Sequence, residues 1–157
     1  MYHYTECGLD NVWLENGYTT RKTAYGDATS VADVDGLLKA LALSLTKKKG
    51  RLTGKELRFL RSCMCLSQER LGKLVGATEG AVSLWERHGK VPKTEDAVVR
   101  MLILEKYDGD GTMEKALELA NDVDRMVNQK LVAKAARDHA WKARSVVGND
   151  ERFALAA

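Results

Sequence analysis

The sequence has no long apolar run and few cysteines. No stretch approaches the roughly 18 consecutive apolar residues of a membrane-spanning helix, and the first residues lack the basic and apolar stretches of a secretory signal peptide. The cysteines form no paired framework, which argues against structural disulfides and for a reducing compartment; they are Cys7, Cys63 and Cys65. We therefore expect a cytoplasmic protein with no membrane contact.

Arrangements typical of catalysis or metal binding are also missing. The histidines follow no metal-ligand spacing, and they stand at His3, His88 and His139. Gly72-x-x-x-Gly76 lacks the Lys-Ser/Thr ending of a phosphate-binding loop. Asp108-Gly-Asp-Gly lacks the glutamate of a calcium loop, because Leu119 occupies that position, and is interpreted as a turn. We expect no enzymatic activity, no cofactor and no metal.

Positive charge is concentrated in one segment. The net charge is only +3, and the hydrophobic fraction of 45% is normal for a globular protein. Residues 47–93, however, carry twelve Lys and Arg against four Glu, a net +8, whereas residues 1–46 carry −3 and residues 94–157 carry −2. Such a concentration is typical of a surface that binds phosphate groups; a plain solvated face is the alternative.

Residues 1–50 are predicted to form an N-terminal module of a β-hairpin and a helix. Val12–Leu14 and Tyr18–Thr20 are short β-prone runs, and Asn16-Gly17 between them suits a tight hairpin turn. Tyr25-Gly26-Asp27 is expected to form a second turn.

The helix of this module is predicted over residues 31–46. Ser30-x-x-Asp33 resembles a capping box at its start. Apolar residues then follow at helical spacing, and they are Val34, Leu37, Leu38, Leu41 and Leu45.

Residues 51–107 are predicted to contain four short helices. The first three begin after residues that cap helices well: Thr53, Ser67 and Thr78. We expect the four helices over residues 54–65, 68–75, 79–87 and 94–107. Their buried side chains are expected to be Leu57, Leu60, Met64, Leu71, Leu74, Val75, Val82 and Trp85.

Residues 112–145 are predicted to form a long C-terminal helix, because this segment is rich in Ala, Leu, Lys and Glu and lacks Gly and Pro. An apolar seam along it suits dimerisation, or alternatively packing against its own domain. The seam comprises Met113, Leu117, Ala120, Val123, Val127, Leu131 and Ala135. If the seam does not dimerise, the candidates are Trp13, Leu37 and Leu41. Residues 146–157 are predicted to be a flexible tail.

The second and third of the four short helices predict a helix-turn-helix. They meet at Gly76-Ala77, where small residues allow two helices to approach closely at a steep angle. Apolar side chains would hold the pair against the preceding helix. The third helix would then present a small, mostly polar outer face: Glu79, Gly80, Ala81, Ser83, Leu84 and Arg87.

This segment resembles the Xre family of phage-repressor-like DNA-binding domains over residues 53–106. The matching features are Ser67-Gln68 at the start of the second helix, the turn Gly76-Ala77-Thr78, and Val82-Ser83-Leu84-Trp85-Glu86-Arg87 at the end of the third. The resemblance implies a mainly α fold, a bundle of four or five short helices. It also implies that Gln68 contacts phosphate and that residues 78–84 face base edges in the major groove.

The candidate DNA-binding residues combine these positions with neighbouring basic ones. They are Ser67, Gln68, Lys73, Thr78, Glu79, Gly80, Ser83, Leu84, Arg87, Lys90 and Lys93. Leu84 would either touch a thymine methyl group or pack against the first helix, and Glu79 would either accept from a cytosine amino group or favour the helix N-terminus.

The layout of the whole chain is similar to that of MqsA/YgiT-type antitoxin regulators, in which a small N-terminal module precedes an Xre-like domain. Those regulators hold zinc through two Cys-x-x-Cys pairs, whereas Cys7 is the only trace here. Cys63 and Cys65 are expected to lie on one helix and to point in different directions. The resemblance therefore implies this layout without its zinc site.

The sequence thus predicts a transcriptional regulator, a repressor that binds palindromic double-stranded DNA as a homodimer. The alternative is an antitoxin that binds a toxin as its protein partner and regulates its own operon. A neighbouring gene for a small toxin would favour the alternative.

Overall fold

The computed structural model describes residues 1–109, 111–113, 117, 129–135 and 141–147. Its helices are α1 (Val34–Thr46), α2 (Gly54–Cys63), α3 (Gln68–Val75), α4 (Glu79–His88) and α5 (Lys93–Asp108). Its strands are β1 (Tyr2–His3), β2 (Trp13–Leu14), β3 (Tyr18–Thr23), β4 (Gly26–Val31), β5 (Gln129–Ala135) and β6 (Trp141–Val147). The chain divides into two compact units, residues 1–121 and 122–157.

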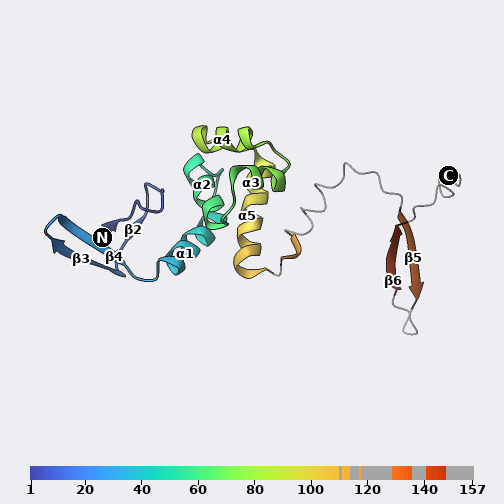
Figure 1. Cartoon of the computed structure of the whole chain (residues 1–157), viewed down its shortest axis with the longest axis horizontal. Coiled ribbons are helices and arrows are strands. Elements are labelled where there is room, and N and C mark those ends of the chain that lie inside the picture. The colour runs from blue at the N-terminus through green and yellow to red at the C-terminus, as the bar shows by residue number, and fades with distance from the viewer. Residues whose placement is uncertain (110, 114–116, 118–128, 136–140, 148–157) are drawn as a thin grey trace. The chain divides into compact units, whose positions relative to one another are not determined.

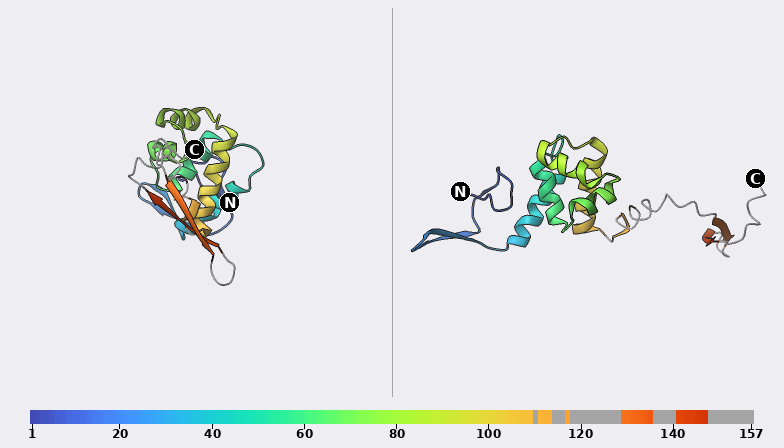
Figure 2. Two further views of the ribbon diagram at one scale, coloured as in Figure 1. Left: turned by 90° about the vertical axis from the view of Figure 1, so that its right-hand side faces the viewer. Right: turned by 45° about the horizontal axis from the view of Figure 1, so that its top comes forward.

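The fold of the first unit is mainly α, with a small N-terminal β module, as predicted. The five helices gather into one bundle (Figures 1 and 2). α4 packs on α2 and α3, whereas α5 packs on α1, α2 and α3. The longest helix, α5, therefore supports the bundle without covering α4.

Local capping sets the beginnings of α2, α3 and α4, as the sequence predicted. The Thr53 hydroxyl accepts from the Glu56 amide, and the Glu56 carboxylate accepts from the Thr53 amide at 2.8 Å, which completes a capping box. The hydroxyls of Ser67 and Thr78 each accept from the backbone amide three residues further on. These caps satisfy amides that the first turn of a helix leaves without partners.

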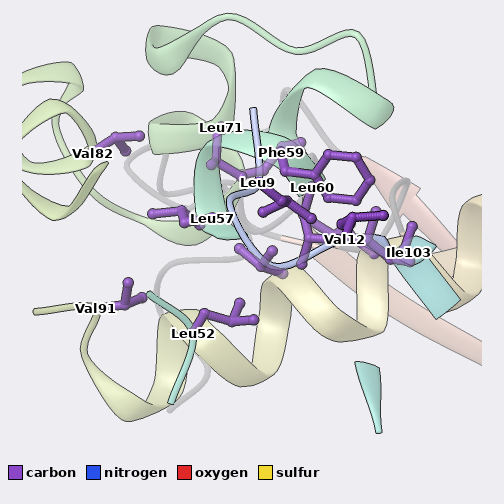
Figure 3. Close-up of a cluster of buried hydrophobic side chains, with 14 of the residues drawn as sticks. Leu9, Val12, Leu52, Leu57, Phe59, Leu60, Leu71, Val82, Val91 and Ile103 are labelled. Atoms are coloured by element: carbon purple, nitrogen blue, oxygen red, sulfur yellow. The ribbon is translucent and has the colours of Figure 1, made fainter. Parts of the chain in front are cut away.

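The core lies around α2, and it confirms most of the predicted buried residues. Leu57, Leu60, Leu71 and Val82 are fully buried, and Figure 3 shows them with Ile103 in one apolar cluster. Some predicted core residues are only half-buried and pack against this cluster: Met64, Val75 and Trp85. α2, α3, α4 and α5 thus share one interior.

The N-terminal module contributes to the same core. Four apolar side chains from the first fourteen residues are buried in it, and they are Tyr4, Leu9, Val12 and Leu14. Figure 3 shows Leu9 and Val12 beside Leu60. Residues 1–50 are therefore fastened to the helices by apolar packing.

The predicted hairpin between Val12–Leu14 and Tyr18–Thr20 is wrong. β2 pairs antiparallel with β1, and β3 pairs antiparallel with β4, with Thr23 opposite Gly26. Gly17 does adopt a positive φ of 77°, but it leads the chain from one sheet to the next. The reason is burial. Leu14 of β2 packs into the core, whereas β3 is exposed along most of its length, so a hairpin of these two strands would have no common buried face.

Asp33 rather than Ser30 caps α1. Its carboxylate accepts from the Gly36 amide at 3.0 Å, and its backbone is left-handed with a φ of 45°. Ser30 instead pairs with Thr19 inside the β3–β4 hairpin. This pairing extends the strand to Val31 and delays the helix.

The predicted C-terminal helix over residues 112–145 is wrong in part, because β5 and β6 form an antiparallel pair with Gln129 opposite Val147. β-branched residues in both segments favour strands, and pairing satisfies the backbone groups of one strand with those of the other. Local helix propensity is a weak prior against such pairing. Within the dimerisation seam, Leu131 and Ala135 belong to β5. The middle of the seam and residues 148–157 of the predicted tail lie outside the described residues.

Candidate nucleic-acid interface

α3 and α4 meet at a tight turn. Gly76 ends α3 in a left-handed conformation with a φ of 71°. Gly72 permits the close approach, because a Cβ on it would lie 2.7 Å from the carbonyl oxygen of Ala77. The predicted turn of the helix-turn-helix is therefore present, and two glycines make it possible.

α4 has one face in the core and one in solvent. Val82 is fully buried, and Trp85 packs against the core from a half-buried position. The start of α2 lies against the end of α4, since a Cβ on Gly54 would lie 2.1 Å from the carbonyl oxygen of Glu86. The opposite side of α4 carries Glu79, Gly80, Leu84 and Arg87, which are exposed, and Ser83, which is partly exposed.

Leu84 points away from the core. Leu84 is 49% exposed, which favours a role at the surface over full packing against the first helix of the domain. An exposed leucine on an outer helix face is available for an apolar contact such as a thymine methyl group.

A buried polar network fixes α4 to α2 and α3. The Arg61 guanidinium donates from Nε to Glu86 Oε1 at 2.5 Å and from Nη2 to Oε2 at 3.1 Å. Gln68 Nε2 donates to Glu86 Oε2 at 2.7 Å, and Arg61 also donates to the carbonyl oxygen of Leu66. The side chains of Arg61 and Glu86 are only 15% and 6% exposed. Sequence reasoning missed this network, because no spacing rule links residues so far apart in the chain.

The predicted site residues of α3 and of the two helix caps take different positions. Ser67 and Thr78 use their hydroxyls as helix caps. Gln68 is half-buried, with its amide on Glu86. Lys73 is exposed and donates to Glu69 at 2.7 Å; that hydrogen bond, together with the lysine charge, lowers the pKa of the Glu69 carboxyl.

The predicted site residues beyond α3 lie in solvent. Arg87 is exposed, and its Nε donates to the carbonyl oxygen of Ser83 at 3.4 Å. Lys90 is exposed in the connection after α4, and Lys93 is exposed at the start of α5. Arg87, Lys90 and Lys93 thus follow one another in the chain, from the last turn of α4 to the first residue of α5.

Part of the basic segment pairs with carboxylates inside the fold. Lys48 binds Glu56 at 2.7 Å, Lys55 binds Asp10, and Arg61 binds Glu86. Glu56 and Glu86, the partners of Lys48 and Arg61, are 8% and 6% exposed, whereas the Lys55–Asp10 pair lies in solvent. The charge concentration seen in the sequence therefore overstates the charge that faces a partner.

Within the described ranges, no group of three His, Cys, Asp or Glu side chains is arranged to hold a metal ion. The expectation that Cys63 and Cys65 share one helix is wrong. α2 ends at Cys63, Met64 caps it, and Cys65 follows with a positive φ of 56°.

The described helices include none that is long and apolar enough to cross a membrane. Comparisons of the chain with protein-family models, with curated proteins and with solved structures find no match.

Proposed function

We propose that this chain is a sequence-specific DNA-binding transcriptional regulator of the cytoplasm. In this proposal α4 enters the major groove and α3 lies across the phosphate backbone. The observation that carries the proposal is the outer face of α4: it is small, mostly polar and exposed, while its inner face is held by Val82 and Glu86. A rigid helix with a free polar face suits the reading of base edges.

Gly80 supports a close approach of a partner to α4. Glycine inside a helix costs about 0.5–1 kcal/mol relative to alanine. No neighbouring group requires it here, because a Cβ on Gly80 would meet only Thr78 Oγ1, at 3.9 Å. We infer that the missing side chain leaves room for a base pair or a phosphate next to the first turn of α4.

Basic groups near both ends of α4 supply the phosphate contacts in this proposal. Arg87, Lys90 and Lys93 follow the helix, and Lys73 stands on α3. Glu69 pairs with Lys73 in the free protein, so phosphate would compete with that carboxylate. Such contacts set orientation and general affinity, whereas Ser83 and Leu84 set the base preference.

As a repressor, the protein would act by steric exclusion. Two copies on a palindromic operator would place two α4 helices about one helical turn of DNA apart, and the occupied site would be closed to polymerase. One recognition helix reads too few base pairs to select a site in a genome, which is why we propose a homodimer.

Selection of random double-stranded DNA by the purified full chain tests the proposal. We expect a recovered palindrome with half-sites centred about 10 base pairs apart. A Ser83→Ala/Leu84→Ala variant should recover an altered motif, and Arg58→Ala serves as a control, because Arg58 is exposed on α2 and is not among the proposed contacts. Recovery of no motif by the wild-type chain would contradict the proposal.

One observation favours the antitoxin alternative as a second candidate. The β3–β4 hairpin is exposed along most of both strands, and Tyr25 at its tip is fully exposed. A free two-stranded ribbon offers edges to which a strand of another protein can add. Co-expression with the product of a neighbouring small gene tests this: a stable complex lost on deletion of residues 19–30 would support it.

A further inference from the structure

α5 presents an apolar strip to solvent. Met101 and Leu104 are 47% and 43% exposed, and Ala97, one turn earlier, is exposed as well. These three residues follow each other at spacings of four and three, so they lie on one face of the helix. Solvent-facing positions of a helix are ordinarily polar, so this strip is unusual for the longest helix of the domain.

The charged residues that border the strip are engaged elsewhere. The Arg100 guanidinium donates to Asp96 and to the carbonyl oxygens of Lys48 and Gly50, all at 2.6 Å. The Glu105 carboxylate accepts from the Met113 amide at 3.3 Å. Neither side chain is free to cover Met101 or Leu104.

The neighbouring helix α1 also keeps apolar side chains partly exposed. α1 packs beside α5, and Ala42 is its only buried residue. Its leucines are all half-buried, and they are Leu37, Leu38, Leu41, Leu43 and Leu45. The α1–α5 side of the bundle therefore remains incompletely covered in the single chain.

Opposite charges stand at the two ends of the strip. Lys93 precedes Ala97 and Asp108 follows Leu104 on the same face, and both are exposed. Consider two antiparallel α5 helices related by a two-fold axis at Met101. Along the helix, Lys93 of one copy lies about 12 Å from this axis. Asp108 of the other copy lies on the same side of the axis, about 10.5 Å from it. A lysine side chain spans the difference easily.

The apolar residues match in the same register. Ala97 of one copy falls opposite Leu104 of the other, so a small side chain faces a large one, and the two Met101 side chains meet at the axis. A parallel pairing would instead place Lys93 against Lys93 and Asp108 against Asp108, which is repulsive. The strip is thus complementary to itself in the antiparallel orientation alone.

From this self-complementarity, we propose that α5 is a homodimer interface, occupied by the α5 of a second copy in antiparallel orientation. α5 packs on α1, α2 and α3 rather than covering α4, so the interface leaves α4 free. This proposal rests on the proposed function, because it identifies the surface through which the proposed homodimer forms. It is tested without DNA, so the two proposals fail separately: a dimer that binds no DNA leaves this one intact.

Sedimentation of the full chain over a range of concentrations is the test. We expect the wild type to dimerise, and Met101→Lys and Leu104→Lys each to weaken dimerisation about tenfold or more. Met101→Lys brings two like charges together at the axis. Leu104→Lys buries an unpaired charge against Ala97 of the other copy. Tyr25→Lys is the matched control: it places the same charge at an exposed residue far along the chain, on the hairpin, and should sediment as the wild type does. Circular dichroism checks that each variant keeps its helices.

A charge exchange tests the orientation. Lys93→Asp alone and Asp108→Lys alone should each weaken dimerisation, and the combined variant should recover most of the wild-type association, because opposite charges again face each other. Three results would overturn the proposal: a monomeric wild type, as expected if the residues after Gly111 cover the strip; dimers insensitive to Met101→Lys and Leu104→Lys; or failure of the combined charge exchange to restore association.

Discussion

Arg61 on α2 and Glu86 on α4 form a two-bond ion pair in the interior, and Gln68 on α3 adds a third donor to the same carboxylate. The helices α2, α3 and α4 are therefore joined at a single carboxylate. Breaking a buried pair from one side leaves a charge without compensation, so we expect Glu86→Ala to lower the free energy of unfolding by about 3 kcal/mol.

Urea unfolding at neutral pH measures this loss. Glu69→Ala is the control, because it removes the carboxylate of the exposed Lys73–Glu69 pair, whose side chains are 62% and 61% exposed. Exposed pairs contribute little, and we expect a much smaller change than for Glu86→Ala. Equal effects of the two substitutions would contradict the structural role assigned to Glu86.

Substitution of Gly80 should change the stability of the fold and the affinity for DNA in opposite directions. Gly80→Ala should raise the free energy of unfolding by about 0.5–1 kcal/mol, because alanine is the better helix former and its Cβ has room in the free protein. The same substitution should weaken DNA binding if a partner approaches Gly80 closely. Thermal unfolding and a fluorescence binding assay measure the two effects, and Gly72→Ala, which should destabilise the fold through its contact with Ala77, provides the contrast.

Salt dependence tests the phosphate contacts. If the dimer neutralises on the order of six to ten phosphates, its affinity for DNA should fall by about a thousandfold or more between about 50 and 200 mM salt. Lys73→Ala and Lys90→Ala should each make that dependence less steep by about one phosphate contact, without changing the preferred sequence. An affinity that stays constant over this range of salt concentration would contradict the proposal that residues 47–93 bind phosphate groups.

The cysteines should differ in reactivity. Burial raises the pKa of the Cys63 thiol, so less of it is thiolate at pH 8, and its half-buried position restricts access. Cys65 is exposed. We expect iodoacetamide to alkylate Cys65 well before Cys63 in the native protein, with the difference lost in denaturant, as peptide mass spectrometry would measure. Faster labelling of Cys63 would contradict the burial of this thiol.

The sequence alone determined the parts of the fold that depend on neighbours along the chain. The caps at Thr53, Ser67 and Thr78 and the turn at Gly76 follow from contacts within four residues, and the apolar spacing of Leu57, Leu60 and Leu71 follows from helix geometry. These features predicted α2, α3, α4 and their arrangement. They also predicted which side of α4 lies in solvent.

Tertiary structure decided what depends on partners far along the chain. The choice of β1 as the partner of β2, the pairing of β5 with β6, and the union of Arg61 with Glu86 each join segments without a local signal. The exposed strip on α5 also depends on tertiary structure. Apolar residues occur on several sides of this helix, and the packing of neighbouring helices decides which of them are buried. The physical reason is common to all: pairing and burial free energies depend on distance in space, whereas propensity and capping depend on distance along the chain.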